Sequence, residues 1–290
     1  MFLNIKRYAF KNTGQVFKLN KKYKSSNFNI ILENKGKYEA INSISPQKWS
    51  PYNFSMEATS VWSFPERGTW ATHNGTYRGN WSPYIPRNVI QRYSQEGDRV
   101  LDQFVGSGTT LIETRLLKRK GIGIDINPSA IDLAIKNTHF KRVGCPGVTL
   151  RTGDARHLDF LPDENIDLIC THPPYGNIIQ YSKNLNGDLS HYDIDRFLLE
   201  MKKVACESFR ILKKGKFCAI MIGDTRKHKN IIPLGFNVMQ LFIDTGFILK
   251  EIVIKKQHNC KSTGFWYKRS IQYNFLLIAH EYLFIFIKPK

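Results

Sequence analysis

Two short stretches of the sequence combine residue types that could perform chemistry together. Residues 102–110 read DQFVGSGTT, and residues 171–175 read THPPY. In the first stretch, Gly106 and Gly108 follow an apolar run and precede a helical pattern, so the backbone can turn tightly and a ligand can approach it closely. The start of that helix also offers free backbone N–H groups. We therefore predict a cofactor loop at 102–110 and a rigid aromatic corner at 171–175.

Two acidic residues extend the predicted cofactor site. Asp125, in GIDINP, lies at the end of the next predicted strand, seventeen residues after Gly108. A carboxylate in this place is suited to binding ribose hydroxyls. Asp154, in TGDA, follows the third strand and could accept a hydrogen bond from an adenine amino group. The sequence has no G-x-x-x-x-G-K-[ST] motif, which disfavours a nucleoside triphosphate. A dinucleotide stays open, although nothing indicates a hydride acceptor.

Regular elements must hold these residues in place, and from residue 87 onward strand and helix patterns alternate. This alternation predicts a mostly parallel sheet with helices on both faces. The segment 49–86 is too irregular and too aromatic for either element, so we expect it to wrap the core or line a site. Strands are predicted over 99–104, 121–127, 148–155, 166–175, 217–224 and 247–257, with two more within 275–287, and helices over 87–94, 110–120, 128–140, 193–212 and 234–246.

The charge balance favours a polyanionic partner. The chain has 290 residues with 43 basic and 24 acidic side chains, a formal net charge of +19. Such an excess is typical of nucleic-acid binding, because each phosphate contact releases counterions. The five cysteines are scattered without zinc-ligand spacing, so we expect no metal site and a reducing cytoplasm. The start of the chain lacks an apolar signal segment, and residues 275–287 are too short to span a bilayer.

Taken together, the motifs resemble those of the amino-methylating DNA methyltransferases, a family of class I S-adenosylmethionine-dependent methyltransferases. DQFVGSGTT resembles the family's D-P-F-x-G-S-G-T-T loop, with Gln103 in place of the usual Pro. NWSPYIPRNVI, residues 80–90, resembles the segment that closes over the methionine part of the cofactor, while GIGIDINP and TGDA resemble the ribose and adenine motifs. THPPY resembles the catalytic [D/N/S]-P-P-[Y/F/W] motif. The resemblance covers roughly residues 60–290.

The resemblance implies a Rossmann-like α/β fold with a mostly parallel seven-stranded sheet, helices on both faces and a C-terminal antiparallel strand. It implies S-adenosyl-L-methionine as cofactor and double-stranded DNA as substrate. It also implies a cognate restriction endonuclease, in the cytoplasm of a bacterium or archaeon, in association with the nucleoid. Residues 61–290 would form the methyltransferase domain. Residues 1–60 would form a basic extension that contacts DNA, or a small solvated hairpin region. No separate target-recognition domain stands out, so recognition would be shared among residues 1–60, 225–232 and 256–270, or would be provided by a homodimer.

The resemblance also assigns residues to the cofactor. Two alternatives stay open: Trp81 and Tyr84 could instead belong to the core, and Asp102 could cap a strand end rather than face the cofactor's ammonium group. The residues expected to bind the cofactor are Trp81, Tyr84, Asp102, Phe104, Gly106, Ser107, Gly108, Thr109, Thr110, Asp125, Ile126, Asp154 and Ala155.

The THPPY corner is suited to methylation of an exocyclic base amine. Such an amine is a poor nucleophile, because its lone pair is conjugated into the ring. A site can help by accepting hydrogen bonds from the NH₂ group, and a base that leaves the duplex needs an aromatic slot. His172, Pro173, Pro174 and Tyr175 are the expected catalytic residues. A backbone carbonyl and the first residue would supply acceptors, and the Tyr175 ring would stack on the base. A structural turn is the alternative.

His172 is where the sequence departs from the family pattern. Relatives that methylate adenine mostly carry Asp or Asn there, and those that methylate cytosine at N4 mostly carry Ser. A neutral imidazole still offers one acceptor nitrogen, or the Pro173 carbonyl could act nearly alone. We favour cytosine-N4 over adenine-N6. An RNA base-amine methyltransferase and a catalytically inactive nucleic-acid-binding protein are the other hypotheses.

Two basic segments are candidates for contact with nucleic acid. The loop after the predicted strand 217–224 reads TRKHKN, and residues 257–270 mix basic and aromatic side chains. Stacking and phosphate contact suit that composition, although a solvated loop and a plain surface hairpin are the alternatives. The expected contact residues are Arg226, Lys227, Lys229, Lys261, Trp266, Lys268 and Arg269.

Overall fold

The apolar runs of the sequence assemble into one central sheet. In the computed structural model, which describes residues 48–176, 181–182, 185–227, 230–259 and 263–290, the strand order is β1-β9-β10-β6-β5-β2-β3-β4. Neighbouring strands are parallel, except that β10 runs antiparallel to both β6 and β9. The strands are β1 (Val61–Ser63), β2 (Arg99–Asp102), β3 (Lys120–Asp125), β4 (Val148–Thr152), β5 (Ile166–Thr171), β6 (Leu212–Ile222), β9 (Ile248–Lys256) and β10 (His280–Ile287). The predicted Rossmann-like α/β fold is confirmed, including the antiparallel C-terminal strand.

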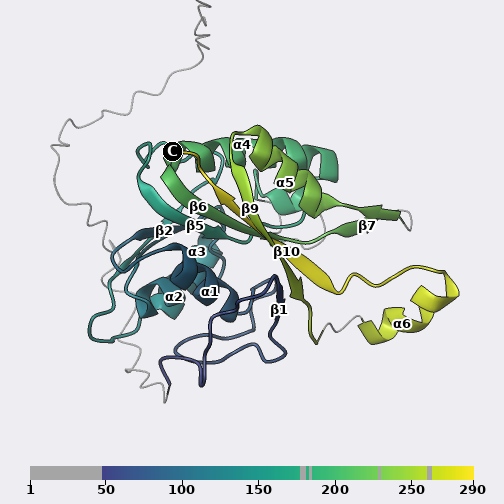
Figure 1. The fold of residues 1–290 in the computed structure, drawn as a ribbon, viewed down its shortest axis with the longest axis horizontal. Helices are drawn as coiled ribbons and strands as arrows, with labels where there is room; N and C mark the ends of the chain where they lie inside the picture. The colour runs from purple at the N-terminus through teal and green to yellow at the C-terminus, as the bar shows by residue number, and fades with distance from the viewer. Residues whose placement is uncertain (1–47, 177–180, 183–184, 228–229, 260–262) are drawn as a thin grey trace, which may run out of the picture. The chain divides into compact units, whose positions relative to one another are not determined.

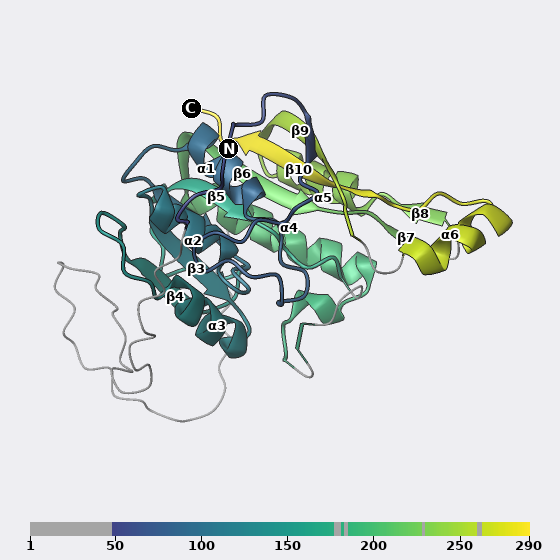
Figure 2. The same ribbon diagram turned by 90° about the horizontal axis from the view of Figure 1, so that it is seen from below.

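Helices cover both faces of the sheet (Figures 1 and 2). One face carries α1, α2 and α3, and the other carries α4 and α5, which pack against each other. The helices are α1 (Tyr84–Tyr93), α2 (Thr109–Leu116), α3 (Pro128–Thr138), α4 (Ile194–Ile211), α5 (Leu234–Asp244) and α6 (Thr263–Gln272), with a 3-10 turn at Leu189–His191. The strands β7 (Thr225–Lys227) and β8 (Asn230–Ile232) form a separate antiparallel hairpin.

Three local predictions were wrong. The described sheet has eight strands rather than seven, because the short β1 adds to the edge of β9 in a segment where no strand is predicted. Residues 275–287 contain one strand rather than two, since β10 begins only at His280, opposite the last residue of β9. The segment 257–270, expected as a loop or hairpin, contains most of α6.

The buried strands explain why the fold forms. Every residue of β5 is buried, because helices cover both of its faces. Above the sheet, Phe197 and Met201 of α4 pack with Phe242 of α5, and on the opposite face α1 contributes Ile85 and Val89. Because β2 to β6 run parallel, their carboxyl ends meet at one edge of the sheet, where an α/β sheet of this kind binds its ligands.

A buried carboxylate anchors the aromatic segment that precedes α1. Glu113 of α2 has no exposed surface. Its Oε1 accepts a hydrogen bond from Trp70 Nε1 at 2.7 Å and lies 2.7 Å from His73 Nε2, and its Oε2 accepts from Arg87 at 2.8 Å. These contacts fix the segment on the sheet and so position Trp81 at the edge where the strands end.

The described helices include none that is long and apolar enough to cross a membrane. Most of the predicted basic extension, residues 1–47, lies outside the described residues.

Candidate active site

The loop between β2 and α2 is shaped by two glycines. Gly106 has φ of 49° and Gly108 has φ of 86°, conformations that favour glycine. A Cβ on Gly108 would also come within 3.3 Å of the Ala134 backbone. The loop therefore packs against α3 while its backbone faces the edge of the sheet.

Asp102 joins this loop to the strand that leads into THPPY. Its carboxylate accepts hydrogen bonds from the hydroxyls of Thr110, at 2.5 Å, and Thr171, at 2.7 Å, and from the backbone N–H of Phe104, at 3.1 Å. Only 2% of Asp102 is exposed, and this burial raises its pKa to about 6 despite the hydrogen bonds. Asp102 also borders the cavity described below, so it has a structural role whatever it contacts there.

Asp125, at the end of β3, holds the loop from the other side. Its two carboxylate oxygens accept hydrogen bonds from the backbone N–H groups of Gly106 and Asn127, each at 2.9 Å. Burial raises the pKa of Asp125 to about 6. Each oxygen keeps a further lone pair, so the carboxylate can still bind hydroxyl donors from a ligand.

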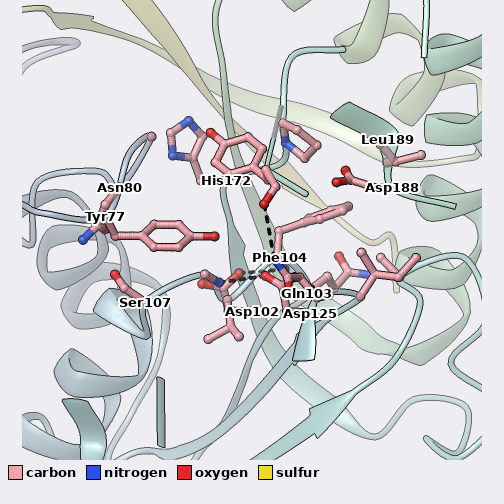
Figure 3. A pocket seen from close by; sticks show the side chains of 18 of the residues that line it. Tyr77, Asn80, Asp102, Gln103, Phe104, Ser107, Asp125, His172, Asp188 and Leu189 are labelled. Atoms are coloured by element: carbon pink, nitrogen blue, oxygen red, sulfur yellow. Dashed lines mark hydrogen bonds between the residues drawn. The ribbon is translucent and has the colours of Figure 1, made fainter. Parts of the chain in front are cut away.

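A cavity opens over these two carboxylates (Figure 3). Its empty volume is about 790 Å³, including the opening to solvent, which is within the range of cofactor sites. Tyr77 and Asn80 reach in from one side, and Asp188 and Leu189 from the opposite side, with His172 at the far end from Asp125 (Figure 3). The predicted cofactor residues that line it are Trp81, Asp102, Phe104, Gly106, Ser107, Thr109, Asp125, Ile126, Asp154 and Ala155.

Three predicted cofactor residues do not line this cavity. Gly108 shapes the turn of the loop, and the Thr110 hydroxyl donates a hydrogen bond to Asp102, so both support the cavity without lining it. Tyr84 belongs to an aromatic cluster, stacked on Phe64 with ring centroids 5.2 Å apart and edge-on to Trp70 at 4.8 Å. Its place matches the alternative that Tyr84 is a packing residue.

Asp154 borders the cavity with its carboxylate already paired. Arg156 donates to both of its oxygens and also binds Glu200 of α4. Burial acts to raise the pKa of Asp154, but the hydrogen bonds from Arg156 outweigh it and hold the pKa below its usual value. Asp154 is therefore ionised at neutral pH and rigidly held.

Sequence reasoning missed several residues of the cavity. Tyr77 lies in the irregular aromatic segment, where no periodicity marks an inward-facing side chain, and Asn80 begins the segment 80–90 predicted to close over the cofactor but was not itself expected to bind it. Asp188 follows the THPPY corner by thirteen positions and also caps the 3-10 turn. Gln103 is notable, because its amide nitrogen is buried with no partner among the described residues, while its amide oxygen accepts from Ser208 at 3.0 Å.

The THPPY corner lies where this cavity meets a second, wider one. His172 and Pro174 line the first cavity, and His172 and Tyr175 line the second, whereas Pro173 is buried and lines neither. The Trp81 ring stacks on His172 with centroids 5.4 Å apart and planes 26° apart. A group in the first cavity and a group in the second would therefore meet at His172.

A chain of polar contacts extends from His172 into the sheet. His172 Nε2 lies 2.6 Å from the Tyr175 hydroxyl, which donates to Glu281 of β10 at 2.8 Å. Lys255 of β9 donates to the other oxygen of Glu281 at 2.9 Å. Burial lowers the pKa of His172 to about 4, so the imidazole is neutral at pH 7. Sequence reasoning missed Glu281 and Lys255, although a carboxylate inside the apolar run 275–287 was a signal.

None of the described residues that were expected to contact nucleic acid lines the second cavity. Residues 255–259 and 280–281, on either side of α6, line it. Trp266, Lys268 and Arg269 are exposed on α6, and Lys227 is exposed on β7. The Arg226 guanidinium donates to the Leu276 carbonyl at 2.8 Å and so joins β7 to the segment after α6. Lys229 and Lys261 lie outside the described residues.

Within the part of the chain that the structure describes, no group of three His, Cys, Asp or Glu side chains could hold a metal ion.

Comparison with known proteins identifies two matching families. A family described as DNA methylase matches residues 2–136 and 166–290, and one described as RMKL-like, methyltransferase domain, matches residues 91–221. The first match covers most of the chain.

Curated relatives match over shorter stretches. The chain is 35% identical over 101 residues to tRNA (guanine(10)-N2)-dimethyltransferase of Methanothermobacter thermautotrophicus, covering 34% of this chain and 29% of the relative. It is 31% identical over 96 residues to type II methyltransferase M.BglI of Bacillus subtilis, covering 33% and 25%. It is 31% identical over 121 residues to type II methyltransferase M.MjaVI of Methanocaldococcus jannaschii, covering 41% and 59%. The aligned regions thus span less than two thirds of each of these relatives.

Proposed function

Because the chain belongs to the DNA methylase family, whose cofactor is S-adenosyl-L-methionine, we propose that it transfers a methyl group to the exocyclic amino group of a nucleic-acid base. The observation that carries the proposal is the position of His172 and the THPPY corner between two cavities. The first cavity would hold the cofactor, and the second, wider one would receive the base.

The residues of the first cavity fit this cofactor. Asp125 presents a carboxylate for ribose hydroxyls, Ile126 and Ala155 present apolar surface for the adenine ring, and Asp154 presents an acceptor for its amino group. The unpaired amide nitrogen of Gln103 is a buried donor that an acceptor in the cavity would satisfy. When bound, the cofactor's sulfonium supplies an electrophilic methyl group.

The protein's own contribution is positioning and hydrogen bonding. The His172 imidazole would accept a hydrogen bond from the amine and so favour its lone pair for attack, while Tyr175 would stack on the base. Pro173 lines neither cavity, so its role would be to shape the corner rather than to bind the amine. His172 has a pKa of about 4, which makes it a weak base at neutral pH. It would therefore serve as a hydrogen-bond acceptor, and the proton that the methylated amine must lose would pass to solvent.

We propose cytosine-N4 in double-stranded DNA as the target, with adenine-N6 as the alternative. The match to the tRNA (guanine(10)-N2)-dimethyltransferase supports a second candidate, an amine in RNA. Nucleoside mass spectrometry tests all three, after incubation with labelled S-adenosyl-L-methionine and either mixed-sequence duplex DNA or total RNA. 4-Methylcytosine in DNA is the expected product. 6-Methyladenine would change the base, and label only in RNA would change the substrate. No label in either would contradict the enzymatic proposal.

We also propose that α6 and its flanking segments contact the nucleic acid outside the second cavity. Figures 1 and 2 show α6 projecting from the body of the protein. The chain carries no acidic residue between Glu251 and Glu281. Phe265 and Tyr267 of α6 are 61% and 60% exposed, and the Arg269 guanidinium lies 4.3 Å from the Phe265 ring centroid. Exposed rings beside cations suit stacking on bases and contact with phosphates.

Substitution on α6 tests this surface. Trp266→Ala is expected to weaken DNA binding roughly tenfold through lost stacking. Arg269→Ala should weaken it and lower the slope of log affinity against log salt by about 1. Fluorescence anisotropy with labelled duplex, at several salt concentrations, measures both. Lys202→Ala, an exposed change on α4 outside both cavities, is the control. An equal loss in the control would indicate only general charge attraction, and a changed oligomeric state with unchanged DNA affinity would make α6 a contact between copies.

The restriction–modification setting, the cognate endonuclease, the homodimer and the nucleoid location are extensions of this proposal. So is the division into a basic extension at 1–60 and a catalytic domain at 61–290. Among the described residues of that extension, the Glu57 N–H donates to Asn88 of α1 at 2.7 Å, so the boundary at residue 60 is not marked by a gap in contacts.

A further inference from the structure

The register of β10 against β9 brings together the buried polar side chains behind the THPPY corner. Lys255 of β9 and Glu281 of β10 are directly opposite each other in the antiparallel ladder, and their side chains are only 15% and 9% exposed. Their ion pair, at 2.9 Å, leaves Glu281 Oε1 to accept the Tyr175 hydroxyl at 2.8 Å. The sheet thus presents an acceptor to Tyr175, and Tyr175 in turn contacts His172 at 2.6 Å.

The hydrogens available in this series of hydrogen bonds determine which ring nitrogen of His172 is protonated. An ionised carboxylate only accepts hydrogen bonds, so the Tyr175 hydroxyl must use its single hydrogen to donate to Glu281. The hydroxyl oxygen can then only accept from His172, which places the imidazole hydrogen on Nε2. A neutral imidazole has one N–H, so Nδ1 is left as an acceptor.

The pKa values of Glu281 and Tyr175 agree with this assignment of hydrogens. Burial acts to raise the pKa of Glu281, but the charge of Lys255 and the hydrogen bonds from Lys255 and Tyr175 outweigh it and hold the pKa below its usual value, so the carboxylate is ionised. Burial, together with Glu281, raises the pKa of Tyr175 well above its usual value, so the hydroxyl keeps its proton. The opposite tautomer would require Tyr175 to donate to His172, which would leave two oxygens 2.8 Å apart with no hydrogen between them.

We propose that Glu281 and Lys255 are positioning residues that hold His172 in the Nε2–H tautomer, so that Nδ1 accepts a hydrogen bond from the amino group of the target base. His172 borders both cavities, and Nδ1 has no hydrogen-bond partner among the described residues. The inference rests on the proposed function. An imidazole held in this way provides the acceptor that Asp, Asn or Ser provides in the motif that THPPY resembles.

Nitrogen-15 NMR of histidine-labelled protein tests the tautomer without any measurement of activity. His172→Asn identifies the His172 signals among those of the eight histidines. The expected result is a protonated, pyrrole-type Nε2 and an unprotonated, pyridine-type Nδ1 at neutral pH. A protonated Nδ1, or an imidazolium with both nitrogens protonated, would overturn the inference.

A double substitution tests the role of the sheet residues. In Glu281→Met with Lys255→Met, the Tyr175 hydroxyl loses its acceptor and is free to donate to His172 Nε2. The tautomer should then switch to Nδ1–H, and kcat should fall about 100-fold, as for the loss of one essential hydrogen bond in an active site. The KM for S-adenosyl-L-methionine should stay within about twofold, because neither residue lines the first cavity. Thermal unfolding of each variant checks that it folds.

Glu281→Gln is the matched comparison. Its amide oxygen can still accept from Tyr175, so the Nε2–H tautomer should persist and kcat should fall less than about tenfold. A double variant that switches tautomer yet keeps wild-type kcat would overturn the role of Nδ1. Active wild-type protein with Nδ1–H would overturn this inference and leave the proposed function intact. Protein with the expected tautomer but no activity on DNA or RNA would instead overturn the proposed function and, with it, the role of Nδ1.

Discussion

Tyr175→Ala is expected to lower kcat about 1000-fold while leaving the affinity for S-adenosyl-L-methionine within about twofold of wild type. Tyr175 lines only the second cavity, so its loss should spare the cofactor. The substitution removes both the ring proposed to stack on the base and the hydroxyl that contacts His172 at 2.6 Å. Both losses act on the target base, and the expected change therefore falls on turnover.

Three measurements separate this result from a folding defect. Isothermal titration gives the cofactor affinity, single-turnover methyl transfer gives the rate, and thermal unfolding gives the stability. Tyr175→Phe keeps the ring and loses only the hydroxyl contacts, so its rate should fall by roughly tenfold. Equal losses of rate and cofactor affinity in Tyr175→Ala would indicate that the corner is a structural turn.

The second large effect is expected at Asp125, where Ala should weaken cofactor binding about 100-fold. The substitution removes the proposed ribose ligand and also the two backbone hydrogen bonds, from Gly106 and Asn127, that shape the cavity. A charge-assisted hydrogen bond and an unsatisfied buried N–H each contribute on this scale. Isothermal titration measures the affinity, and Asp132→Ala, a carboxylate of α3 that does not line the cavity, is the control. An unchanged affinity would remove Asp125 from the ribose role.

Lowering the pH should change the cofactor affinity and the stability of the wild-type protein in opposite directions. Protonation of Asp125 at its pKa of about 6 removes acceptor capacity, so cofactor affinity should fall as the pH drops below 6. Stability should change in the opposite direction. Because the folded pKa exceeds the unfolded value of about 4, the native state binds more protons in the window between them, and unfolding free energy rises as pH falls through it. In Asp125→Asn the pH dependence of affinity should weaken, while Asp102, which also lines the cavity and whose pKa is also about 6, keeps part of both the affinity trend and the stability trend.

Much of the fold could be predicted from the sequence, because the central strands are buried on both faces. Four of the six residues of β5 are apolar, and the glycines that follow β2, with the carboxylates that end β2 and β3, mark the edge where ligands bind. These signals are local, so spacing alone could place Asp102 and Asp125 at one cavity. The three-residue β1 gives no such signal, and α6 has aromatic and basic residues on its exposed surface rather than one apolar face.

The missed site residues depend on contacts between distant segments. Tyr77 reaches the cavity because Glu113 anchors the aromatic segment through Trp70 and His73, more than thirty residues earlier in the chain. Glu281 and Lys255 meet only through the register of β10 against β9. A shift of one residue in that register would turn Glu281 to the other face of the sheet. No pattern within either strand specifies that alignment.

The cross-strand pair also has an evolutionary consequence. Residues in contact have non-additive effects on substitution, with coupling energies of about 0.5–3 kcal/mol. Under the proposed role, histidine at position 172 gains a fixed acceptor only while residue 281 offers Tyr175 a hydrogen-bond acceptor, and a carboxylate at 281 is neutralised by the lysine at 255. A lineage that replaced Glu281 first would lose the benefit of His172, whereas one that restored Ser or Asp at 172 would release the constraint on 255 and 281. We therefore expect these three positions to covary among relatives, with the order of substitutions determining which intermediates stay active.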